Sequence, residues 1–397
     1  MTKMEVDEQL LEYATPRQAE LIRAWAEHGS TRKAAKALGL NSTLFSQAYE
    51  RVKAKAALKG YAPNFDMLKR VPEPFVVKGT STLYGKDGEQ KLQWVKTKLD
   101  DEQRFMMLQS FAESLGDNCR DKSPDIPAPE TDLSSMLAVY PMGDPHFGMF
   151  SWAEETGEDF DVRIAERDLS TAVARLVDTA PPTDTAIVLN LGDFFHADND
   201  RKTTARSGNI LDVDTRHAKV MRIGALTMVR AIELAAAKHR KVIVRNVIGN
   251  HDDHSSYALA LILDAYFNNN PRVTIDCSPA NFWYFQFGRV LIGSTHGHTC
   301  KLPDLPAIMA NDRPEMWGDT KFRYWYTGHV HHESVKDLVG VRVETFRTLA
   351  PNDAWGAASG YRGQRDMHCI VLHEKYGEVD RHRVNIAMVR DLQKDAA

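Results

Sequence analysis

Five short clusters of histidine, aspartate and asparagine, each following an apolar run, constrain this chain more than any other feature of its sequence. The length and content of these runs predict buried strands. The runs are Met136–Tyr140, Ala186–Leu191, Val242–Ile248, Val290–Ser294 and Tyr324–Tyr326. Because ligand sites in open α/β sheets form where loops leave the carboxyl ends of strands, five such clusters predict one shared crevice.

The clusters contain side chains that bind divalent cations. They read Asp144-Pro-His146, Gly192-Asp193, Gly249-Asn250-His251-Asp252, His296-Gly-His298 and Gly328-His329-Val330-His331. Carboxylate and amide oxygens combined with imidazole nitrogens suit Mn²⁺, Fe²⁺ or Zn²⁺. About eight ligands of this kind in one crevice are enough for two ions. A lone histidine at a strand end is more often a hydrogen-bonded polar group, so the prediction depends on all five clusters together.

The order of the clusters resembles the pattern of the calcineurin-like metallophosphoesterases, which is DxH, GD, GNH followed by an acidic residue, His, and GHxH. The resemblance covers roughly Leu137 to His332, with weaker likeness onward to about Asn385. It implies an α/β fold of the metallophosphoesterase type, an α/β/β/α sandwich. It also implies hydrolysis of phosphoesters with two divalent metal ions, for which we expect Mn²⁺, with Fe²⁺ or Zn²⁺ as alternatives.

The resemblance also assigns the metal ligands, residue by residue. One ion would bind Asp144, His146 and His331, and the other would bind Asn250, His296 and His329. Asp193 would bridge the two. Ions held about 3.5–4 Å apart in this way lower the pKa of a shared water for in-line attack on phosphorus.

Further residues near the motifs are candidates for catalysis or substrate contact. His251 matches the family histidine near the leaving oxygen, which an imidazolium could protonate, and Asp252 would orient its ring. His298 and His196 are candidates for orienting the ligands or contacting substrate. Three arginines beside motif loops are candidates for binding a polyanion, with a solvated surface as the alternative: Arg216, Arg222 and Arg362.

Composition bounds the class of protein. The chain has 397 residues, 43% of them hydrophobic, which is ample for a large domain with additions. No apolar run approaches the length of a membrane span, and the acidic, polar start lacks a signal sequence. We therefore expect a cytoplasmic protein without a membrane partner, in a bacterial or phage-infected cell. The four cysteines lack CxxC spacing, so neither a zinc knuckle nor a disulfide framework is predicted.

The N-terminal region has a different charge from the whole chain. The net charge is −4, yet residues 31–60 carry seven Lys or Arg against one Glu. Thr15-Pro16, Ser30-Thr31 and Asn41-Ser42 each precede apolar residues at helical spacing and predict three helices. The segment Ala34–Leu40 resembles a helix-turn-helix signature, in which small residues let two helices touch. We expect an all-α helix-turn-helix domain over residues 1–61.

The third of these helices carries the candidate DNA contacts. Thr43, Gln47, Arg51 and Lys55 recur every fourth residue and would share one polar face. Leu44, Phe45, Ala48 and Val52 are expected to pack inward. This layout fits contact with the major groove of DNA. A three-helix protein-interaction module and a solvated basic helix are the alternatives.

Residues 62–132 are expected to link this domain to a metallophosphoesterase domain over residues 133–397. Phe75–Tyr84 and Lys91–Lys98 alternate apolar and polar residues around a glycine-rich turn, which predicts a β-hairpin. The hairpin is either a nucleic-acid clamp or an ordinary hairpin packed on the catalytic domain. A helical stretch near Asp101–Leu115 and a linker over Asp117–Thr131 would follow.

The resemblance limits the reaction class but not the substrate, because one fold and site type serve many phosphoesters. A tethered DNA-binding domain raises the local concentration of DNA, which favours a DNA nuclease. This layout looks like that of phage-encoded or prophage-encoded metallophosphoesterases, distantly similar to the nuclease subunit of bacterial double-strand-break repair complexes. One alternative is a small-substrate phosphatase or cyclic-nucleotide phosphodiesterase with an N-terminal assembly module. Another is a DNA-binding regulator whose metal site is vestigial.

Overall fold

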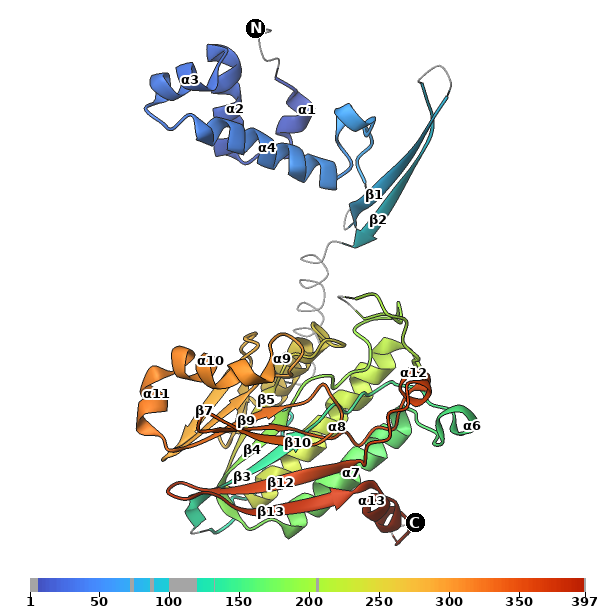
Figure 1. The fold of residues 1–397 in the computed structure, drawn as a ribbon, viewed down its shortest axis with the longest axis vertical. Coiled ribbons are helices and arrows are strands. Elements are labelled where there is room, and N and C mark those ends of the chain that lie inside the picture. Colours follow the sequence, from blue (N-terminus) through green and yellow to red (C-terminus); the bar gives the residue numbers. More distant parts are fainter. Residues whose placement is uncertain are drawn as a thin grey trace. The chain divides into compact units, whose positions relative to one another are not determined.

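The fold is described from a computed structural model (Figure 1). It describes residues 6–71, 75–85, 89–99, 120–131, 133–204 and 207–395. The chain divides into two compact units, Met1–Met107 and Leu108–Ala397. The predicted helical stretch near Asp101–Leu115 lies outside the described residues.

The first unit contains the three predicted helices, and their caps explain where they begin. They are α2 (Pro16–His28), α3 (Thr31–Leu38) and α4 (Thr43–Leu58), preceded by the short α1 (Glu8–Leu11). Thr15 and Ser30 cap α2 and α3 through their side chains. Asn41 accepts a hydrogen bond from the backbone N–H of Thr43 at 3.0 Å, so it is Asn41 rather than Ser42 whose side chain caps α4.

The faces of α4 agree with the prediction except at Leu44. Phe45, Ala48 and Val52 are buried. Leu44 is 41% exposed, so the expectation that it packs inward is wrong. The reason is helical spacing, because Leu44 lies three residues before Gln47 and seven before Arg51, and so shares their exposed face.

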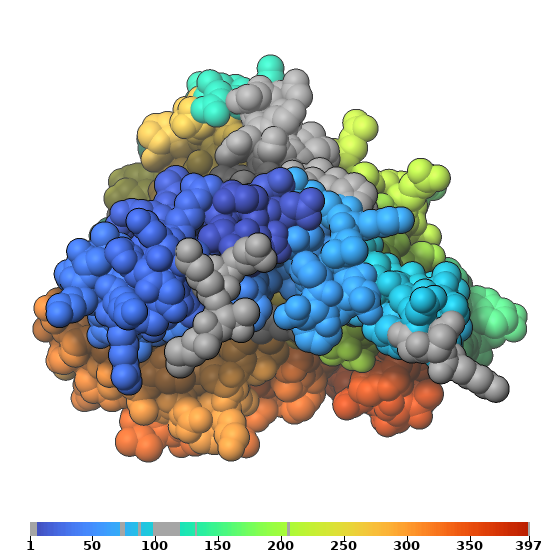
Figure 2. All heavy atoms as spheres, turned by 90° about the horizontal axis from the view of Figure 1, so that it is seen from above, coloured from blue at the N-terminus to red at the C-terminus, as the bar shows by residue number. Residues whose placement is uncertain are grey.

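The predicted hairpin is confirmed as an antiparallel pair, β1 (Phe75–Tyr84) with β2 (Gln90–Leu99). Its turn residues 86–88 lie outside the described residues. The hairpin contacts the 3₁₀ turn η1 (Pro63–Phe65), where the Tyr84 hydroxyl donates to Asp66 at 2.7 Å. In the space-filling view, side chains of the helices (blue) and of the hairpin (cyan) form one continuous surface of this unit (Figure 2).

The second unit contains two sheets, and all five predicted strands are confirmed within them. The six-stranded sheet has the order β13-β12-β3-β4-β5-β6, in which β3 to β6 run parallel. Its strands are β3 (Leu133–Met142), β4 (Thr183–Asn190), β5 (Lys241–Asn246), β6 (Val273–Asp276), β12 (Asp366–His373) and β13 (Gly377–Asn385). The five-stranded sheet has the order β10-β11-β9-β8-β7. Its strands are β7 (Trp283–Phe287), β8 (Val290–Ser294), β9 (Phe322–Thr327), β10 (Ser334–Leu338) and β11 (Val341–Thr345).

Alternation along the strands produces the four layers of the expected α/β/β/α sandwich (Figure 1). In β3, Ala138 and Tyr140 join the core beneath the helices α7 (Val162–Thr179), α8 (His217–Lys238) and α9 (Ser255–Phe267). Their neighbours Leu137 and Val139 join a second core between the sheets. Trp325 of β9 points outward to a third core with α10 (Leu305–Asp312) and α11 (Pro314–Asp319). Each fully buried large apolar side chain contributes about 1.5–3 kcal/mol.

Several shorter elements complete this unit. The helices α6 (Ala153–Thr156), α12 (Ala354–Ala358) and α13 (Ile386–Asp395) and the 3₁₀ turn η2 (Leu302–Asp304) lie outside the sheets. The described part of the predicted linker, residues 120–131, has no helix or strand and is hydrogen-bonded to the end of α9 through the carbonyls of Ala265 and Tyr266. No helix among the described residues is long and apolar enough to cross a bilayer.

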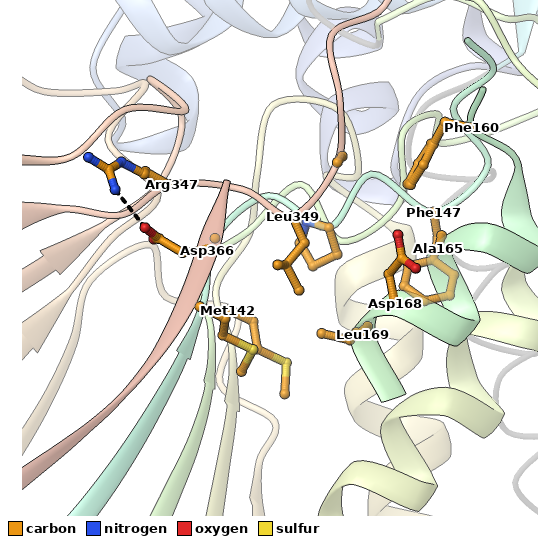
Figure 3. Close-up of a pocket in the computed structure, with 13 residues that line it drawn as sticks. Met142, Phe147, Phe160, Ala165, Asp168, Leu169, Arg347, Leu349 and Asp366 are labelled. Atoms are coloured by element: carbon orange, nitrogen blue, oxygen red, sulfur yellow. Dashed lines mark hydrogen bonds and ion pairs between the residues drawn. The ribbon is translucent and has the colours of Figure 1, made fainter. Parts of the chain in front are cut away.

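A buried aspartate fixes the C-terminal helix to the sandwich. Asp168 of α7 is 1% exposed and accepts hydrogen bonds from Arg390 and Gln393 of α13 at 3.0 and 2.9 Å. It lines a cavity of about 20 Å³, with Met142 and Leu169 on its wall (Figure 3). This volume is enough for about one water molecule. Burial raises the pKa of the Asp168 carboxyl.

Candidate metal centre

The five motifs leave the carboxyl ends of strands from both sheets. Three follow β3, β4 and β5 of the first sheet, and two follow β8 and β9 of the second. The strands within each set are parallel, so their carboxyl ends meet at one edge. The expected crevice therefore lies where two sheets come together, and not along the edge of a single open sheet.

The first group of donors is the predicted one. Asp144, His146 and His331 each offer a ligand atom, and these atoms lie within 4.8 Å of one another. The Nε2 atoms of His146 and His331 are 3.0 Å apart, and Nε2 of His331 is 3.6 Å from Oδ1 of Asp144. Asp144 is fully buried, and both its oxygens accept the backbone N–H of His329 at 3.0 Å.

The second group joins the remaining predicted ligands. Asp193, His296 and His329 form it, and Nε2 of His296 lies 3.2 Å from Oδ2 of Asp193. The same Nε2 lies 3.1 Å from Oδ1 of Asn250. The other ring nitrogen of His296, Nδ1, is 2.8 Å from the carbonyl oxygen of Leu191. A hydrogen bond donated there leaves Nε2, which faces Asp193 and Asn250, as the nitrogen that could bind a metal after losing its proton.

Backbone strain is concentrated at these ligands. Among the described residues, nine that are not glycine have a positive φ, and five of them belong to the predicted ligands. The five are Asp144, His146, Asp193, His329 and His331, with φ between 44° and 72°. Each such conformation costs about 1–3 kcal/mol and persists only where the surrounding structure holds it. These strained conformations bring the donor atoms of the five residues close together.

Two motif glycines are required by close approach. A Cβ on Gly249 would lie 2.0 Å from Oδ1 of Asp193, and a Cβ on Gly328 would lie 2.5 Å from Oδ2 of Asp144. Real Cβ atoms do not come so close to carboxylate oxygens, so any side chain at these positions would displace a ligand. This explains why glycine precedes Asn250 in the third motif and His329 in the fifth.

The geometry fits divalent cations. The Nε2 atoms of His146 and His331 lie 3.0 Å apart beside the Asp144 carboxylate, so they can share either a proton or a bound cation. Burial, followed by the charge of His331, lowers the pKa of His146 well below its usual range and keeps it neutral. Burial acts to raise the pKa of Asp193, but the charges of His296 and His251 outweigh it and hold that pKa well below its usual range.

His296 carries the counter-charge of this carboxylate. Burial acts to lower the pKa of His296, but the charge and hydrogen bond of Asp193, together with Asp144, raise it to about 10. A cation bound by His296 therefore has to displace its proton, because ligand histidines bind metal in the neutral form.

The structure corrects the expected relation between His251 and Asp252. Nδ1 of His251 lies 2.8 Å from the carbonyl oxygen of His196, and its Nε2 lies 3.9 Å from Oδ2 of Asp193. Asp252 instead accepts hydrogen bonds from the N–H groups of Gly249 and Phe195 and from the Ser256 hydroxyl. The ring of His251 is therefore oriented by a backbone carbonyl, and Asp252 holds the loops. Burial, followed by the charge of Asp193, raises the pKa of Asp252 to about 7.

His196 lies behind a ligand instead of on an open loop. It is 2% exposed, and its Nδ1 is 3.2 Å from Nδ1 of His146. A proton on Nδ1 of His146 satisfies this contact and leaves Nε2 of His146 facing His331. Burial lowers the pKa of His196 to about 3, so it is a neutral acceptor. With His146 and His251 it also forms a third possible metal-binding group.

Of the remaining predicted site residues, some lie near the proposed ligands and others lie away from them. The ring of His298 packs near those of His296 and His329, at centroid distances of 5.3 and 6.1 Å. Arg216 and Arg222 are exposed and do not line the pocket that contains the ligands. Arg216 lines a neighbouring pocket of about 520 Å³. Thr43, Gln47, Arg51 and Lys55 are all exposed on α4 in the first unit.

Five of the seven predicted ligands, His146, Asp193, Asn250, His329 and His331, line a pocket with a volume of about 670 Å³. One wall consists of α12 and the loop after it, which contribute Trp355, Tyr361 and Arg362. Arg362 lines the pocket, with its Nη1 donating to the carbonyls of Ala357 and Tyr361. Arg365 also lines the pocket, but its guanidinium is paired with Glu158.

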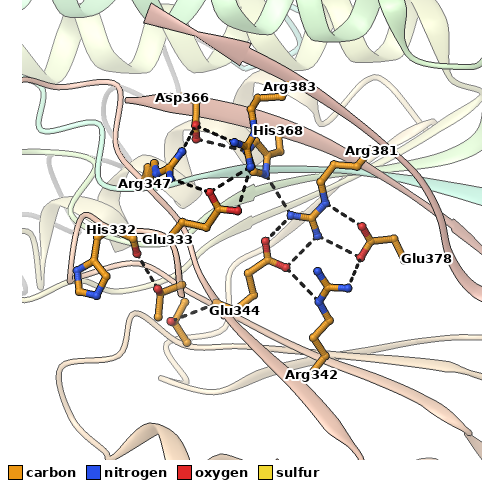
Figure 4. Close-up of polar contacts among 12 residues, drawn as sticks. His332, Glu333, Arg342, Glu344, Arg347, Asp366, His368, Glu378, Arg381 and Arg383 are labelled. Carbon is orange, nitrogen blue, oxygen red and sulfur yellow. Dashed lines mark hydrogen bonds and ion pairs between the residues drawn. The ribbon is translucent and has the colours of Figure 1, made fainter. Parts of the chain in front are cut away.

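A charged network anchors the strand that follows the last motif (Figure 4). Glu333, two residues after His331, is paired with Arg347 at 3.1 Å and with Arg383 at 2.9 Å. Arg347 also pairs with Asp366 of β12 at 2.5 Å. Next to Arg347, the Thr348 hydroxyl donates to the carbonyl oxygen of Asp144 at 2.6 Å. Residues after β11 thereby fix both the first motif and the last, and no sequence motif marked them.

No protein-family model and no curated protein matches the sequence. Among solved structures, an archaeal phosphodiesterase is 15% identical over 62% of this chain and 99% of its own, with a TM-score of 0.31. Vps29 from Entamoeba histolytica, solved with Zn²⁺, is 14% identical over 63% of this chain and 99% of its own, with a TM-score of 0.26. A predicted phosphoesterase from Streptococcus pneumoniae TIGR4 is 11% identical over 63% of this chain and 98% of its own, with a TM-score of 0.25. Similarity at this level assigns neither an activity nor a substrate to this chain.

Proposed function

We propose that this protein is a two-metal-dependent phosphodiester hydrolase that acts on DNA. The observation that carries the proposal is the convergence of seven donor residues from five strand-end loops, five of them held in strained backbone conformations. Structural histidines and carboxylates need neither that strain nor that proximity. The first ion would bind Asp144, His146 and His331, and the second would bind Asn250, His296 and His329, with Asp193 shared.

The protein's own side chains would complete the chemistry of phosphodiester cleavage. Two bound divalent ions, which we expect to be Mn²⁺, would supply positive charge for the phosphoryl oxygens and lower the pKa of the attacking water. His251 lines the same pocket, with its Nδ1 2.8 Å from the His196 carbonyl oxygen. That hydrogen bond leaves Nε2 directed to the pocket, where it can hold a proton for the leaving oxygen. The His196 carbonyl is thus the positioning group for His251.

The N-terminal unit supports DNA as the substrate. Its α4 exposes Thr43, Gln47, Arg51 and Lys55 at four-residue spacing, and residues 31–60 carry seven basic residues against one acidic residue. A helix of this kind fits the major groove, and its basic residues attract phosphates without sequence preference. Tethering it to a phosphodiesterase raises the local concentration of DNA.

Cleavage assays test this proposal directly. We would incubate the intact protein and Mn²⁺ with supercoiled, linear and single-stranded DNA, and with bis-p-nitrophenyl phosphate in parallel. We expect DNA cleavage that is lost in Asp193→Ala. Turnover of the small diester without cleavage of any DNA would favour the alternative, a small-molecule phosphodiesterase with an N-terminal assembly module.

A further inference from the structure

We propose that Trp355 and Tyr361 form a stacking surface for an unpaired nucleobase, so that the metal centre acts on single-stranded DNA. The inference rests on the proposed function and deepens it, because it names the form of DNA that the pocket accepts. It begins from two large aromatic side chains that no metal or catalytic role explains.

Both aromatic residues line the pocket that contains the metal ligands. Trp355 is 68% exposed and Tyr361 is 53% exposed, whereas most described aromatic side chains of this unit are buried in its cores or packed against them. Their ring centroids are 5.7 Å apart, with an angle of 37° between the planes. Two large ring faces are therefore open to the same space as His329 and His331.

The loop that carries the two rings is held in place by its own hydrogen bonds. The Asn352 amide donates to the carbonyl of Tyr361 at 2.7 Å and closes the loop. Asp353 caps α12 by accepting the N–H of Gly356 at 2.7 Å, and the Ser151 hydroxyl donates to the carbonyl of Asn352 at 2.8 Å. The rings are thus presented by a fixed segment, so little conformational entropy is lost when a ligand stacks on them.

The chemistry of the pocket favours a nucleobase over other flat groups. The metal ions that the donor residues would hold would bind a phosphate, and a nucleic acid links every phosphate to a base through one sugar. Arg362 adds a positive charge at the same wall, with its guanidinium fixed by the carbonyls of Ala357 and Tyr361. Stacking of a base on an aromatic side chain does not depend on the identity of the base. Because the rings and the donor residues line one pocket, we expect a single nucleotide to contact both the bound metal ions and the aromatic wall.

The same geometry discriminates between strands that are paired and unpaired. In a duplex both faces of a base are already stacked, and extruding it costs free energy. A single strand offers its base faces freely. We expect single-stranded DNA, or the frayed end of a duplex, to be cleaved faster than intact duplex.

Tetranucleotides test the inference on the full-length protein, because they are too short to depend on the N-terminal helices. We would compare tetrathymidylate with a tetramer of the same backbone in which the bases are replaced by abasic residues, in Mn²⁺. Trp355→Ala should raise KM and lower kcat/KM for tetrathymidylate by about 5- to 150-fold, the range expected for one stacked base. It should leave the abasic tetramer unchanged, and Trp355→Phe should restore most of the loss.

Two further measurements separate stacking from damage to the fold. Affinity for the tetramers, measured by competition with a fluorescent oligonucleotide in Ca²⁺, should fall in parallel with kcat/KM. Tyr376→Ala is the matched control, since Tyr376 is 66% exposed on the turn between β12 and β13, outside the pocket, and should change neither value.

The outcomes distinguish the two levels of the proposal. Equal losses on both tetramers, or no loss on either, would overturn the stacking surface while leaving a nuclease. Failure of the unaltered protein to cleave any oligonucleotide, with turnover of bis-p-nitrophenyl phosphate retained, would overturn the proposed function itself and the stacking surface with it.

Discussion

At the scale of single residues, the proposed metal ligands and the proposed proton donor should respond differently to substitution. Asp144→Ala should empty one metal position, because its buried carboxylate belongs to the first donor group. His251→Ala should retain the metals and lose rate by about 10²–10⁴-fold, as expected when an acid–base group is removed. Metal content by mass spectrometry, measured beside turnover, checks both variants. A metal-free His251→Ala protein would show that His251 is a ligand, in the group it forms with His146 and His196.

A second residue-scale prediction concerns stability at low pH. His239 is fully buried, with its ring between the Tyr140 hydroxyl and Thr183, and burial lowers its pKa to about 4. The unfolded chain binds this proton with a pKa near 6.5. Because the unfolded state holds more protons between these values, stability falls as the pH drops from about 6.5 toward 4.

The size of this effect can be measured with one variant. Between pH 8 and pH 5, His239 should remove about 2 kcal/mol from the free energy of unfolding. Guanidinium denaturation at pH 8 and at pH 5 measures the loss of unfolding free energy between the two pH values. In His239→Asn this loss should be smaller than in the unaltered protein by about 2 kcal/mol. His28→Asn, in the other unit, is the control and should keep the full pH dependence. An unchanged difference in His239→Asn would mean that this histidine is protonated in the folded state.

The sequence motifs predicted which donor residues converge, but not which residues support them. Asp144, His296 and their partners could be predicted because each stands in a short motif after an apolar run. Asp252 was given the wrong contact, since adjacency to His251 in the sequence says nothing about the direction of two neighbouring side chains. Thr348 and Trp355 had no motif at all, and only the folded chain shows that they reach the site.

At the scale of elements, the strands were predictable but their division into sheets was not. β3 and β8 each contain a buried, mainly apolar run, and period-two alternation is the same in either sheet. Which strands pair depends on contacts between distant segments, such as β3 with β12. The sandwich could be expected only from the resemblance of the motifs. Leu44 is a different case, because its helical spacing from Gln47 and Arg51 already places it on the exposed face of α4 although its side chain is apolar.

The charged network after the last motif gives an element-scale prediction. Arg347→Met leaves Asp366, which is 4% exposed, and Glu333 with one cation fewer. Removing one partner of a buried ion pair typically costs about 3 kcal/mol or more. We expect a loss of this size, together with weaker Mn²⁺ binding because Glu333 follows His331. Arg175→Met removes an exposed pair with Asp178 and should cost at most about 1 kcal/mol. Equal small losses in both variants would show that the network does not support the site.

Helix α4 gives the other element-scale prediction. Arg51 and Lys55 are exposed on it, and each is expected to neutralise one DNA phosphate. Replacing both by alanine should weaken duplex binding and reduce the slope of log K against log salt by about 1.8. Lys394→Ala on α13 is the control, since its exposed pair is local to that helix. Fluorescence anisotropy over a salt series gives the slopes, and an unchanged slope in the double variant would argue for an assembly module.

At the scale of the whole molecule, two compact units divide the proposed work. The first exposes a basic helix and a hairpin, and the second brings together the residues that we propose as metal ligands, proton donor and aromatic wall. Neither unit alone defines a DNA nuclease, because a metal centre of this type can serve many phosphoester substrates and the helix has no catalytic role. The central claim is therefore the metal centre itself.

Anomalous diffraction from crystals soaked in Mn²⁺ tests that claim most directly. We predict two peaks about 3.5–4 Å apart. One should lie against Asp144, His146 and His331, the other against Asn250, His296 and His329, with Asp193 touching both. A single peak among His146, His196 and His251, or no peak at saturating Mn²⁺, would contradict the account.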